Sequence, residues 1–467
     1  MAKDPLEVAN LASEVANGNF GDERLNKRLG AIVGRLVKDP SLSLPQAFDS
    51  AGLEGAYRFF SNPLVTPEGI LSAHEEATNQ RCGTRDDFLV VHDSSTFSYR
   101  EHGERNGLGP TRRNTPGSRQ VFFAHASLAV SADGNRRPLG VVALETWTRP
   151  AVPKGVEYQR WEDQIRAVSA RLDGGANAIH LADREADDYE MFYSLQRDKL
   201  RFVVRCLNNR WLADTLTPQK LHALFALLPS TVEREVQLPR RKPRPTAITQ
   251  KIYPAREARM ATLCISAAKV LLKKPKSIRP HTIHPPESVA INVVRVWEPN
   301  PPAGEAAIEW YLYTTEPIET AEQQLLVVDY YRARWRIEEY FKCIKTGCDF
   351  LSRQLHDYEA LVNLLATFAP IAYRLLLIRS EATRDPDQPG AELLSTDQLD
   401  VLRIRGRLKL SSNPTAGEVY FAVAALGGHI KYSGNPGWLT LARGYQKLDI
   451  LTEGWVAAKL QLTSDQR

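Results

Sequence analysis

Three acidic residues stand where a metal-dependent reaction could use them: Asp93, Asp183 and Glu338. Asp93 and Asp183 each follow a short apolar run that is typical of a buried strand, and open sheets place ligand-binding groups at the ends of their strands. Either aspartate alone is an ordinary strand-end residue, because Asp is common in turns. Together, three carboxylates could bind two Mg²⁺ ions about 3.5–4 Å apart, which would activate the attacking oxygen and stabilise the leaving oxygen in phosphodiester chemistry.

Glu338 lies in a segment whose helical periodicity begins at Thr320 and ends near Lys345. Tyr331, Arg334, Glu338 and Lys345 follow one another at intervals of 3, 4 and 7 residues, so a continuous helix would carry all four along one stripe. One interpretation is an exposed ion pair between Arg334 and Glu338, worth about 0.2–0.5 kcal/mol. The other assigns Glu338 to a metal and its three neighbours to the phosphate, sugar or base of a nucleic acid.

Other residue patterns exclude competing sites. Glu339 is the alternative acid on this helix, but it lies about 100° around the axis from Glu338 and off the stripe. The ten histidines form no HxH or HExxH pattern and the five cysteines no CxxC pair, so a zinc site is disfavoured and the thiols are expected to be reduced and structural. His92 should point to the sheet face opposite Asp93 and serve as a core or hydrogen-bonding residue. Hard oxygen ligands favour Mg²⁺ or Mn²⁺.

The elements that would position these residues alternate in the middle of the chain. An apolar run at 88–91 is followed by strands at 120–130 and 139–147, whose connecting turn contains Asp133 and Gly134 and predicts a hairpin. A helix at 156–172, a strand at 178–182, a helix to about residue 196 and a strand at 202–205 come next. The order βββαβαβ predicts a mixed α/β fold with a ribonuclease-H-like catalytic core.

The segments around this core differ from it in composition. Residues 211–318 combine many prolines with alternating strand patterns, and we interpret them as a β-rich insertion into the core. Short helices are expected in the first 80 residues, and longer ones at about 358–379, 395–408, 415–427 and 438–461. We therefore expect small all-helical domains at residues 1–70 and 381–467, flanking a core at residues 71–380.

The positive charge is concentrated in one segment. The net charge is only +5, but twelve Lys and Arg residues stand between Arg240 and Arg279, against the single acid Glu257. That density suits a surface that tracks phosphates, and the alternative is a solvated basic hairpin. No apolar run approaches the roughly 20 residues that span a bilayer, and no signal-peptide core follows Met1, so we expect a cytoplasmic protein.

One segment resembles a known family. The run from Tyr331 to Lys345 fits the Tyr-x2-Arg-x3-Glu-x6-Lys signature of the insertion-sequence-four family of DDE transposases. Further stretches resemble that family in the same order along the chain: Glu54-Gly-Ala-Tyr-Arg-Phe, Asp93-Ser-Ser-Thr with Ser98-Tyr99-Arg100, Asp183-Arg-Glu-Ala-Asp187, Arg201-Phe-Val-Val-Arg205 and Leu426-Gly-Gly. The resemblance covers essentially the whole chain, although residues 386–412 match poorly.

The resemblance implies roles for individual residues. Asp93, Asp183 and Glu338 would bind two Mg²⁺ ions, for which Mn²⁺ could substitute, and Tyr331, Arg334 and Lys345 would contact DNA near the cleavage site. Trp310 would stack a flipped-out base and so hold the strand open for hairpin formation. Its alternative is an ordinary core aromatic. Lesser candidates for the same pocket are Trp335 and Arg205.

The resemblance also implies a cut-and-paste reaction on double-stranded DNA. Water nicks one strand at the transposon end, the freed 3′-OH attacks the opposite strand to form a hairpin, water opens the hairpin, and the 3′-OH attacks target DNA. A homodimer would pair two transposon ends through the C-terminal helices, in a bacterial cytoplasm and on the nucleoid when bound to DNA. Two other hypotheses are a domesticated DNA-binding protein on the same fold and a ribonuclease-H-like nuclease without strand transfer.

Overall fold

The computed structural model describes residues 14, 18–38, 40–99, 105–110, 120–149, 159–213, 216–241, 243, 254–276, 284–430 and 434–464 of the chain. Its contacts divide it into two compact units. The first comprises Met1–Phe88, Asp93–Pro153 and Trp335–Arg467, and the second comprises Leu89–His92 and Lys154–Arg334. Strand β1 (Phe88–Tyr99) contributes to both.

The strands of the first unit form a meander around β3 (Gln120–Ser131). β3 pairs antiparallel with β4 (Pro138–Trp147) and with the short β2 (Gly109–Pro110), and it neighbours β1 in the sheet. Eleven of the twelve residues of β3 are buried, which explains why its sequence reads as a nearly continuous apolar run. The predicted hairpin is therefore confirmed, with β3 and β4 as its strands.

The second unit continues from the first residues of β1 in the strand order β5, β6, β10, β9, β8, β7. β5 (Ala178–Ala182) and β6 (Arg201–Arg205) are parallel, and the pairs from β6 through β10, β9 and β8 to β7 are antiparallel. The other strands are β7 (Val232–Leu238), β8 (Arg259–Lys273), β9 (Ser288–Trp297) and β10 (Glu309–Thr314). A parallel pair that follows an antiparallel meander, with helices between the strands, confirms the mixed α/β, ribonuclease-H-like fold and its β-rich insertion.

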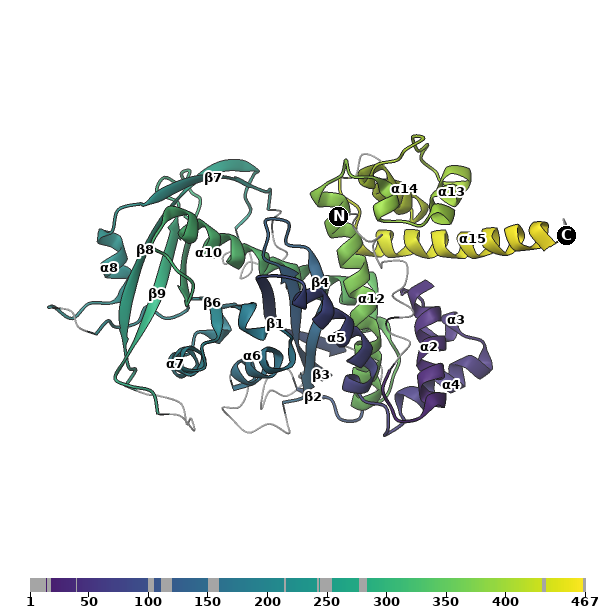
Figure 1. The fold of residues 1–467 in the computed structure, drawn as a ribbon, viewed down its shortest axis with the longest axis horizontal. Coiled ribbons are helices and arrows are strands. Elements are labelled where there is room, and N and C mark those ends of the chain that lie inside the picture. The colour runs from purple at the N-terminus through teal and green to yellow at the C-terminus, as the bar shows by residue number, and fades with distance from the viewer. Residues whose placement is uncertain are drawn as a thin grey trace. The chain divides into compact units, whose positions relative to one another are not determined.

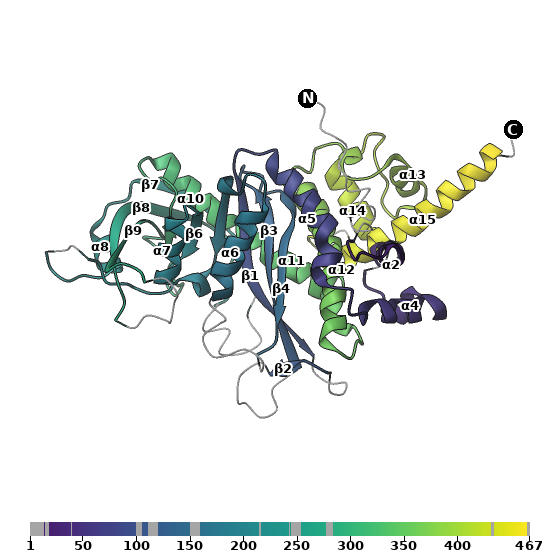
Figure 2. The ribbon, with the colours of Figure 1, turned by 60° about the horizontal axis from the view of Figure 1, so that its bottom comes forward.

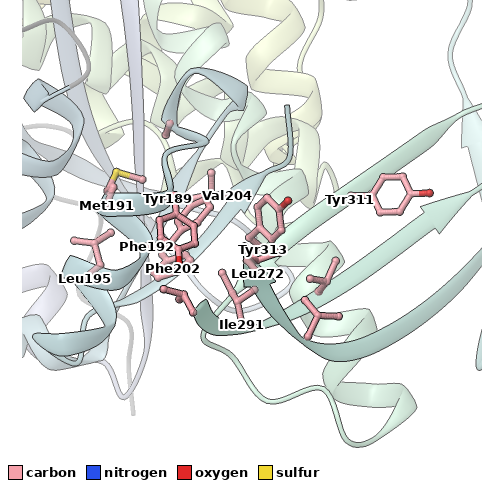
Figure 3. Close-up of a cluster of buried hydrophobic side chains, with 14 of the residues drawn as sticks. Tyr189, Met191, Phe192, Leu195, Phe202, Val204, Leu272, Ile291, Tyr311 and Tyr313 are labelled. Carbon is pink, nitrogen blue, oxygen red and sulfur yellow. The ribbon is translucent and has the colours of Figure 1, made fainter. Parts of the chain in front are cut away.

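The helices of the second unit cover its strands. They are α6 (Gln159–Arg171), α7 (Tyr189–Arg197), α8 (Leu221–Leu227) and α10 (Ala321–Ala333). Figure 3 shows the resulting core, in which Phe192 of α7 stacks on Phe202 of β6 with ring centroids 5.6 Å apart. Tyr313 of β10 packs beside them, so strands on both sides of β6 share one core. The predicted helix at 156–172 begins in residues outside the described part, and its described portion is α6.

Helices make up most of the first unit (Figures 1 and 2). Toward the N-terminus lie α2 (Glu23–Lys38), α3 (Leu44–Ala47), α4 (Ser50–Phe60) and α5 (Pro67–Gly83). After the second unit come α11 (Trp335–Lys342), α12 (Tyr358–Arg384), α13 (Thr396–Arg405), α14 (Ala416–Leu426) and α15 (Trp438–Ser464). The predicted helical character of both ends is confirmed, while the domain boundaries at residues 70 and 380 stay predictions.

Helix α12 corrects the expectation that no apolar segment is long enough to cross a membrane. Its 27 residues meet that criterion by length and composition, but 94% of its most apolar window is buried inside the protein. It packs against α5 and β4, and the Asn363 side chain donates to the carbonyls of Phe60 and Val65. We therefore interpret α12 as the core helix of the first unit.

Strand β1 differs from the sequence prediction in its length. A strand that ended at Asp93 was expected, but β1 continues to Tyr99, so Asp93 lies in the middle of the strand. The polar segment that follows is held in the sheet because Ser94 Oγ lies 2.8 Å from His125 Nδ1 on β3. Phe97 is buried and stacks on Phe122 of β3 at 4.9 Å, which supplies the apolar contacts that this half of the strand needs.

The single helix predicted from residue 320 to 345 is also corrected. α10 ends at Ala333, α11 begins at Trp335, and a π-helical turn occupies Cys343–Gly347. In that turn the Cys348 amide donates to the Cys343 carbonyl, five residues back, which changes the angular spacing that an α-helix would give Lys345. Tyr331, Arg334, Glu338 and Lys345 are therefore not carried by one uninterrupted α-helix.

Candidate active site

In the second unit, Asp183 follows the last residue of β5. It adopts an extended backbone conformation, and its Oδ1 accepts from the Glu185 amide at 2.8 Å, which begins a short 3-10 turn (Arg184–Ala186). The side chain is half-buried. The sequence prediction of a strand-end aspartate is thus confirmed for this residue, because the apolar run 178–182 is a fully buried parallel strand.

Arg205 lies beside Asp183 because their strands are parallel neighbours. Ala182 of β5 pairs with Val204 of β6, so the next residues, Asp183 and Arg205, lie at the same edge of the sheet. β10 pairs with β6 on its other side, with Leu312 opposite Arg205. Two residues earlier on β10 stands Trp310, which is half-buried at that edge.

Trp310 is flanked by a cation and by a second ring. The guanidinium carbon of Arg205 lies 5.6 Å from the centre of the indole, and Tyr331 meets it edge to face at 5.7 Å with an interplanar angle of 67°. Both contacts suit the negative face of an aromatic ring. The structure thus brings together Arg205, Trp310 and Tyr331, three of the residues selected from the sequence.

Tyr331 also interacts with two further predicted residues, Arg334 and Asp183. The guanidinium carbon of Arg334 lies 5.9 Å from the Tyr331 ring centre. Burial raises the pKa of the Tyr331 hydroxyl, Arg334 and Arg205 oppose that rise, and Asp183 adds to it. Burial likewise lowers the pKa of Arg205. Asp183, Arg205, Tyr331 and Arg334 therefore act on one another electrostatically within the second unit.

The first unit contains the other half of the predicted site. Lys345 leaves the π-helical turn and reaches β1, where its Nζ donates to Ser95 Oγ at 2.7 Å and to the Thr96 carbonyl at 2.8 Å. Burial lowers the pKa of Lys345 to about 8, and the nearby charge of Asp93 opposes that shift. Asp93 is half-buried, and its Oδ1 accepts from the Ser94 amide at 2.8 Å.

Glu338 lies half-buried on α11, in the first unit, with Asp93 and Lys345. The competing acid Glu339 pairs with Arg336 at 2.9 Å, which gives it a structural role on the same helix. Trp335 is 60% exposed at the start of α11 and belongs to the first unit, whereas the Trp310 pocket belongs to the second. The predicted residues are thus divided between the two units, with Asp93, Trp335, Glu338 and Lys345 in the first and Asp183, Arg205, Trp310, Tyr331 and Arg334 in the second.

The donor chemistry of these acids fits a hard divalent cation. All three are carboxylates in half-buried positions, without a thiol or imidazole among them, and carboxylate oxygens are the ligands that Mg²⁺ prefers. Within the described residues, no group of three or more His, Cys, Asp or Glu side chains is arranged to hold a metal ion. Asp93 and Glu338 belong to one unit and Asp183 to the other, so their joint action stays a prediction.

Two buried histidines, His92 and His180, precede Asp93 and Asp183 along the chain. Only His92 was expected from the sequence. His92 was expected in the core, and its Nε2 lies 2.8 Å from Nδ1 of His180 on β5. His180 Nε2 lies 2.7 Å from Ser169 Oγ of α6. A histidine in the middle of the apolar run 178–182 was the available signal, because a buried imidazole needs hydrogen-bond partners.

Acidic side chains neutralise part of the positive charge of the basic segment, residues 240–279. Arg259 at the start of β8 pairs with Glu298 and with Glu305, and Lys274 pairs with Glu287 at 3.3 Å, so acids outside the segment neutralise some of its charge. Lys269, Lys273 and Lys276 are exposed. Four members of the segment lie outside the described residues: Lys242, Arg244, Lys251 and Arg279.

Two family models match the chain. The transposase DNA-binding model matches residues 9–65, and the transposase DDE domain model matches residues 85–372, which is more than half of the 467 residues. The chain belongs to the DDE transposases. It is accordingly a DDE transposase enzyme that binds DNA, and this family generally uses divalent metal ions.

The cryo-EM structure of the piggyBac transposase synaptic complex with hairpin DNA is similar to this DDE transposase. The two chains share 11% sequence identity, with a TM-score of 0.38 over 82% of this chain and 77% of the other.

Proposed function

We propose that this DDE transposase is a cut-and-paste enzyme of the insertion-sequence-four type, similar to the transposase of the bacterial transposon Tn-five. The observation that carries the proposal is the grouping of Arg205, Tyr331 and Arg334 around Trp310, beside Asp183. An enzyme that only cuts DNA has no use for a pocket that stacks a base. An enzyme that folds a DNA end into a hairpin must hold a base out of the helix.

The three acids would bind the metal ions together. Asp93, Asp183 and Glu338 would hold two Mg²⁺ ions, which when bound would activate the attacking oxygen and stabilise the leaving oxygen. The Asp183 carboxylate is oriented by the Glu185 amide, and that of Asp93 by the Ser94 amide. Such outer hydrogen bonds fix the direction in which a carboxylate presents its oxygens to a cation.

The cationic side chains would hold the DNA strand around this centre. Lys345 is anchored through Ser95 and Thr96 on the strand that carries Asp93, so its ammonium group stands near the first acid. Arg334, whose guanidinium carbon lies 5.9 Å from the Tyr331 ring centre, would pair with a phosphate. Trp310 would stack the flipped base, with Arg205 and the exposed Trp335 as lesser contributors.

The partners follow from this reaction. The substrate would be double-stranded DNA: transposon ends first and target DNA afterwards. The N-terminal helices and the exposed lysines of the basic segment would grip the duplex, and the C-terminal helices would pair two protomers in a synaptic homodimer. We assign the reaction to a bacterial cytoplasm, with the enzyme on the nucleoid when it is bound to DNA.

The test is incubation of the protein with its own flanking terminal repeats and Mg²⁺, followed by denaturing gel analysis of the DNA ends. We expect a nicked product first, then a hairpin end, then an opened end that joins target DNA. Cleavage without a hairpin would favour a ribonuclease-H-like nuclease. Binding without cleavage would favour a domesticated DNA-binding protein, and either result would overturn the proposal.

A further inference from the structure

A second aspartate of the segment after β5 makes contacts that the reaction does not explain. Asp187 is fully buried, and one of its carboxylate oxygens, Oδ2, accepts from the amides of Leu207 and Asn208 at 2.7 Å each. Its other oxygen, Oδ1, accepts from Arg210 Nε at 3.1 Å and from Arg210 Nη2 at 2.5 Å. Both oxygens are therefore occupied by donors, which distinguishes Asp187 from a metal ligand.

Asp187 joins the two connections that leave the active-site edge of the second unit. It closes the 3-10 turn that Asp183 begins, four residues earlier, and the next residue, Asp188, caps α7. Its donors Leu207 and Asn208 stand two and three residues after Arg205. One buried carboxylate thus ties the turn that carries Asp183 to the loop that begins at Arg205.

Arg210 completes this tie. Its Nη2 also donates to the Asp187 carbonyl at 3.0 Å, so the guanidinium contacts both the side chain and the backbone of one residue. Burial alone would lower the pKa of Arg210, but the charge of Asp187 and its hydrogen bonds raise it instead. A buried ion pair of this kind is costly to desolvate, so it is a poor device for stability alone and a better one for fixing a single geometry.

We propose that Asp187, held by Arg210 and by the amides of Leu207 and Asn208, is a positioning residue that sets the Asp183 carboxylate and the Arg205 side chain for the reaction. The inference rests on the proposed function, because it assumes that Asp183 binds a metal ion. Loss of a group that orients a metal ligand typically weakens metal affinity or activity by about 10–100-fold. A purely structural pair would lower stability without this effect on the metal.

The chain offers a matched control in a second buried ion pair of the same unit. Arg201, at the start of β6, pairs with Glu316 at 3.0 and 2.6 Å, and the Glu316 side chain is only 6% exposed. Asp187→Asn and Glu316→Gln each remove one carboxylate charge from a pair at opposite ends of β6. Both variants should lose thermal stability, and only Asp187→Asn should change the metal site.

The experiment measures the dissociation constant of Mn²⁺ by electron paramagnetic resonance, together with the Mg²⁺ concentration that half-saturates cleavage of transposon-end DNA. We expect Asp187→Asn to raise the dissociation constant and the half-saturating concentration about tenfold or more. Glu316→Gln should leave both within about twofold of wild type. If Asp187→Asn does not fold, Arg210→Gln keeps the carboxylate and should give a smaller rise in the same direction. The proposal would be overturned if Asp187→Asn and Arg210→Gln both bind Mn²⁺ as tightly as Glu316→Gln does.

Different results would refute the proposed function and the positioning role of Asp187. Asp183→Ala that cleaves like wild type would refute the metal role of Asp183, and with it the proposed function. Inactive Asp183→Ala beside Asp187→Asn with wild-type metal binding would refute only the positioning role.

Discussion

The guanidinium group of Arg205 covers the ring of Trp310, with 5.6 Å between the guanidinium carbon and the ring centre. Tyr331 stands against the same ring at 5.7 Å. A nucleobase that stacks on Trp310 would take the place that Arg205 holds, or would lie against the ring together with it. Hairpin formation should therefore depend on Trp310 more than the first nick does.

Trp310→Ala should slow hairpin formation by at least about tenfold and leave the first nick within about threefold of wild type. The reason is that stacking on an aromatic side chain contributes about 1–3 kcal/mol per base, and only the hairpin step needs the base flipped. Nicked and hairpin products can be counted separately on a denaturing gel.

The matched control is Trp211→Ala, which removes a half-exposed tryptophan of the same unit that lies beside Lys220. It should leave both steps unchanged. Equal losses of nicking and hairpin formation in Trp310→Ala would contradict the base-stacking role.

We expect DNA binding to depend on pH through the ammonium group of Lys345. Its pKa is lowered to about 8, so the ammonium form is lost as the pH rises through 8. If the charged form binds DNA phosphate, affinity for transposon-end DNA should fall by up to about tenfold between pH 7 and pH 9, following the protonated fraction. Fluorescence anisotropy with labelled DNA at constant ionic strength would measure it.

Lys345→Arg should flatten that profile, because a guanidinium group stays charged throughout this range. Lys342→Gln, which alters an exposed lysine at the end of α11, should keep the wild-type profile. An unchanged decline in Lys345→Arg would show that another group titrates.

We expect the protein to lose folding stability in acid because of His180. Burial lowers its pKa to about 3, against the ordinary value of 6.5, so the unfolded chain binds a proton that the folded chain rejects. The neutral ring therefore contributes fully above pH 6.5, and stability falls as the pH drops from 6.5 toward 3, by up to about 1.4 kcal/mol per pH unit.

His180→Met cannot take up that proton. It should be less stable at pH 7 by about 1–3 kcal/mol, because it removes the partner of His92 Nε2 and of Ser169 Oγ. Urea unfolding at pH 7 and pH 5 should then show a smaller loss for this variant than for wild type. Parallel losses in the two proteins would refute the role of His180 in the acid response.

The sequence predicted best the elements whose signal is local. The buried run 178–182 became β5, and the two strands joined by the turn at Asp133 became the β3–β4 hairpin. Helix α10 begins where expected because Thr320 and Gln323 form a capping box. Each of these depends on neighbouring residues only.

The sequence failed where distant partners decide the structure. Polar residues after Asp93 looked like the end of a strand, but His125, 31 residues after Ser94, keeps them in the sheet. Tyr331 and Arg334 lie close to each other, as their spacing predicts, yet the anchors of Lys345 are Ser95 and Thr96, 250 and 249 residues away. No periodicity within a segment encodes such contacts.

We expect Glu338, and not its neighbour Glu339, to complete a catalytic triad with Asp93 and Asp183. The direct measurement compares Glu338→Gln with Glu339→Gln in Mg²⁺-dependent cleavage of transposon-end DNA, with DNA binding measured in parallel. Glu339 pairs with Arg336 on the same helix, so its variant controls for the loss of one acid there. We expect Glu338→Gln to bind DNA without cutting it, and Glu339→Gln to cut. If Glu338→Gln cleaves like wild type, Glu338 is not the third catalytic acid.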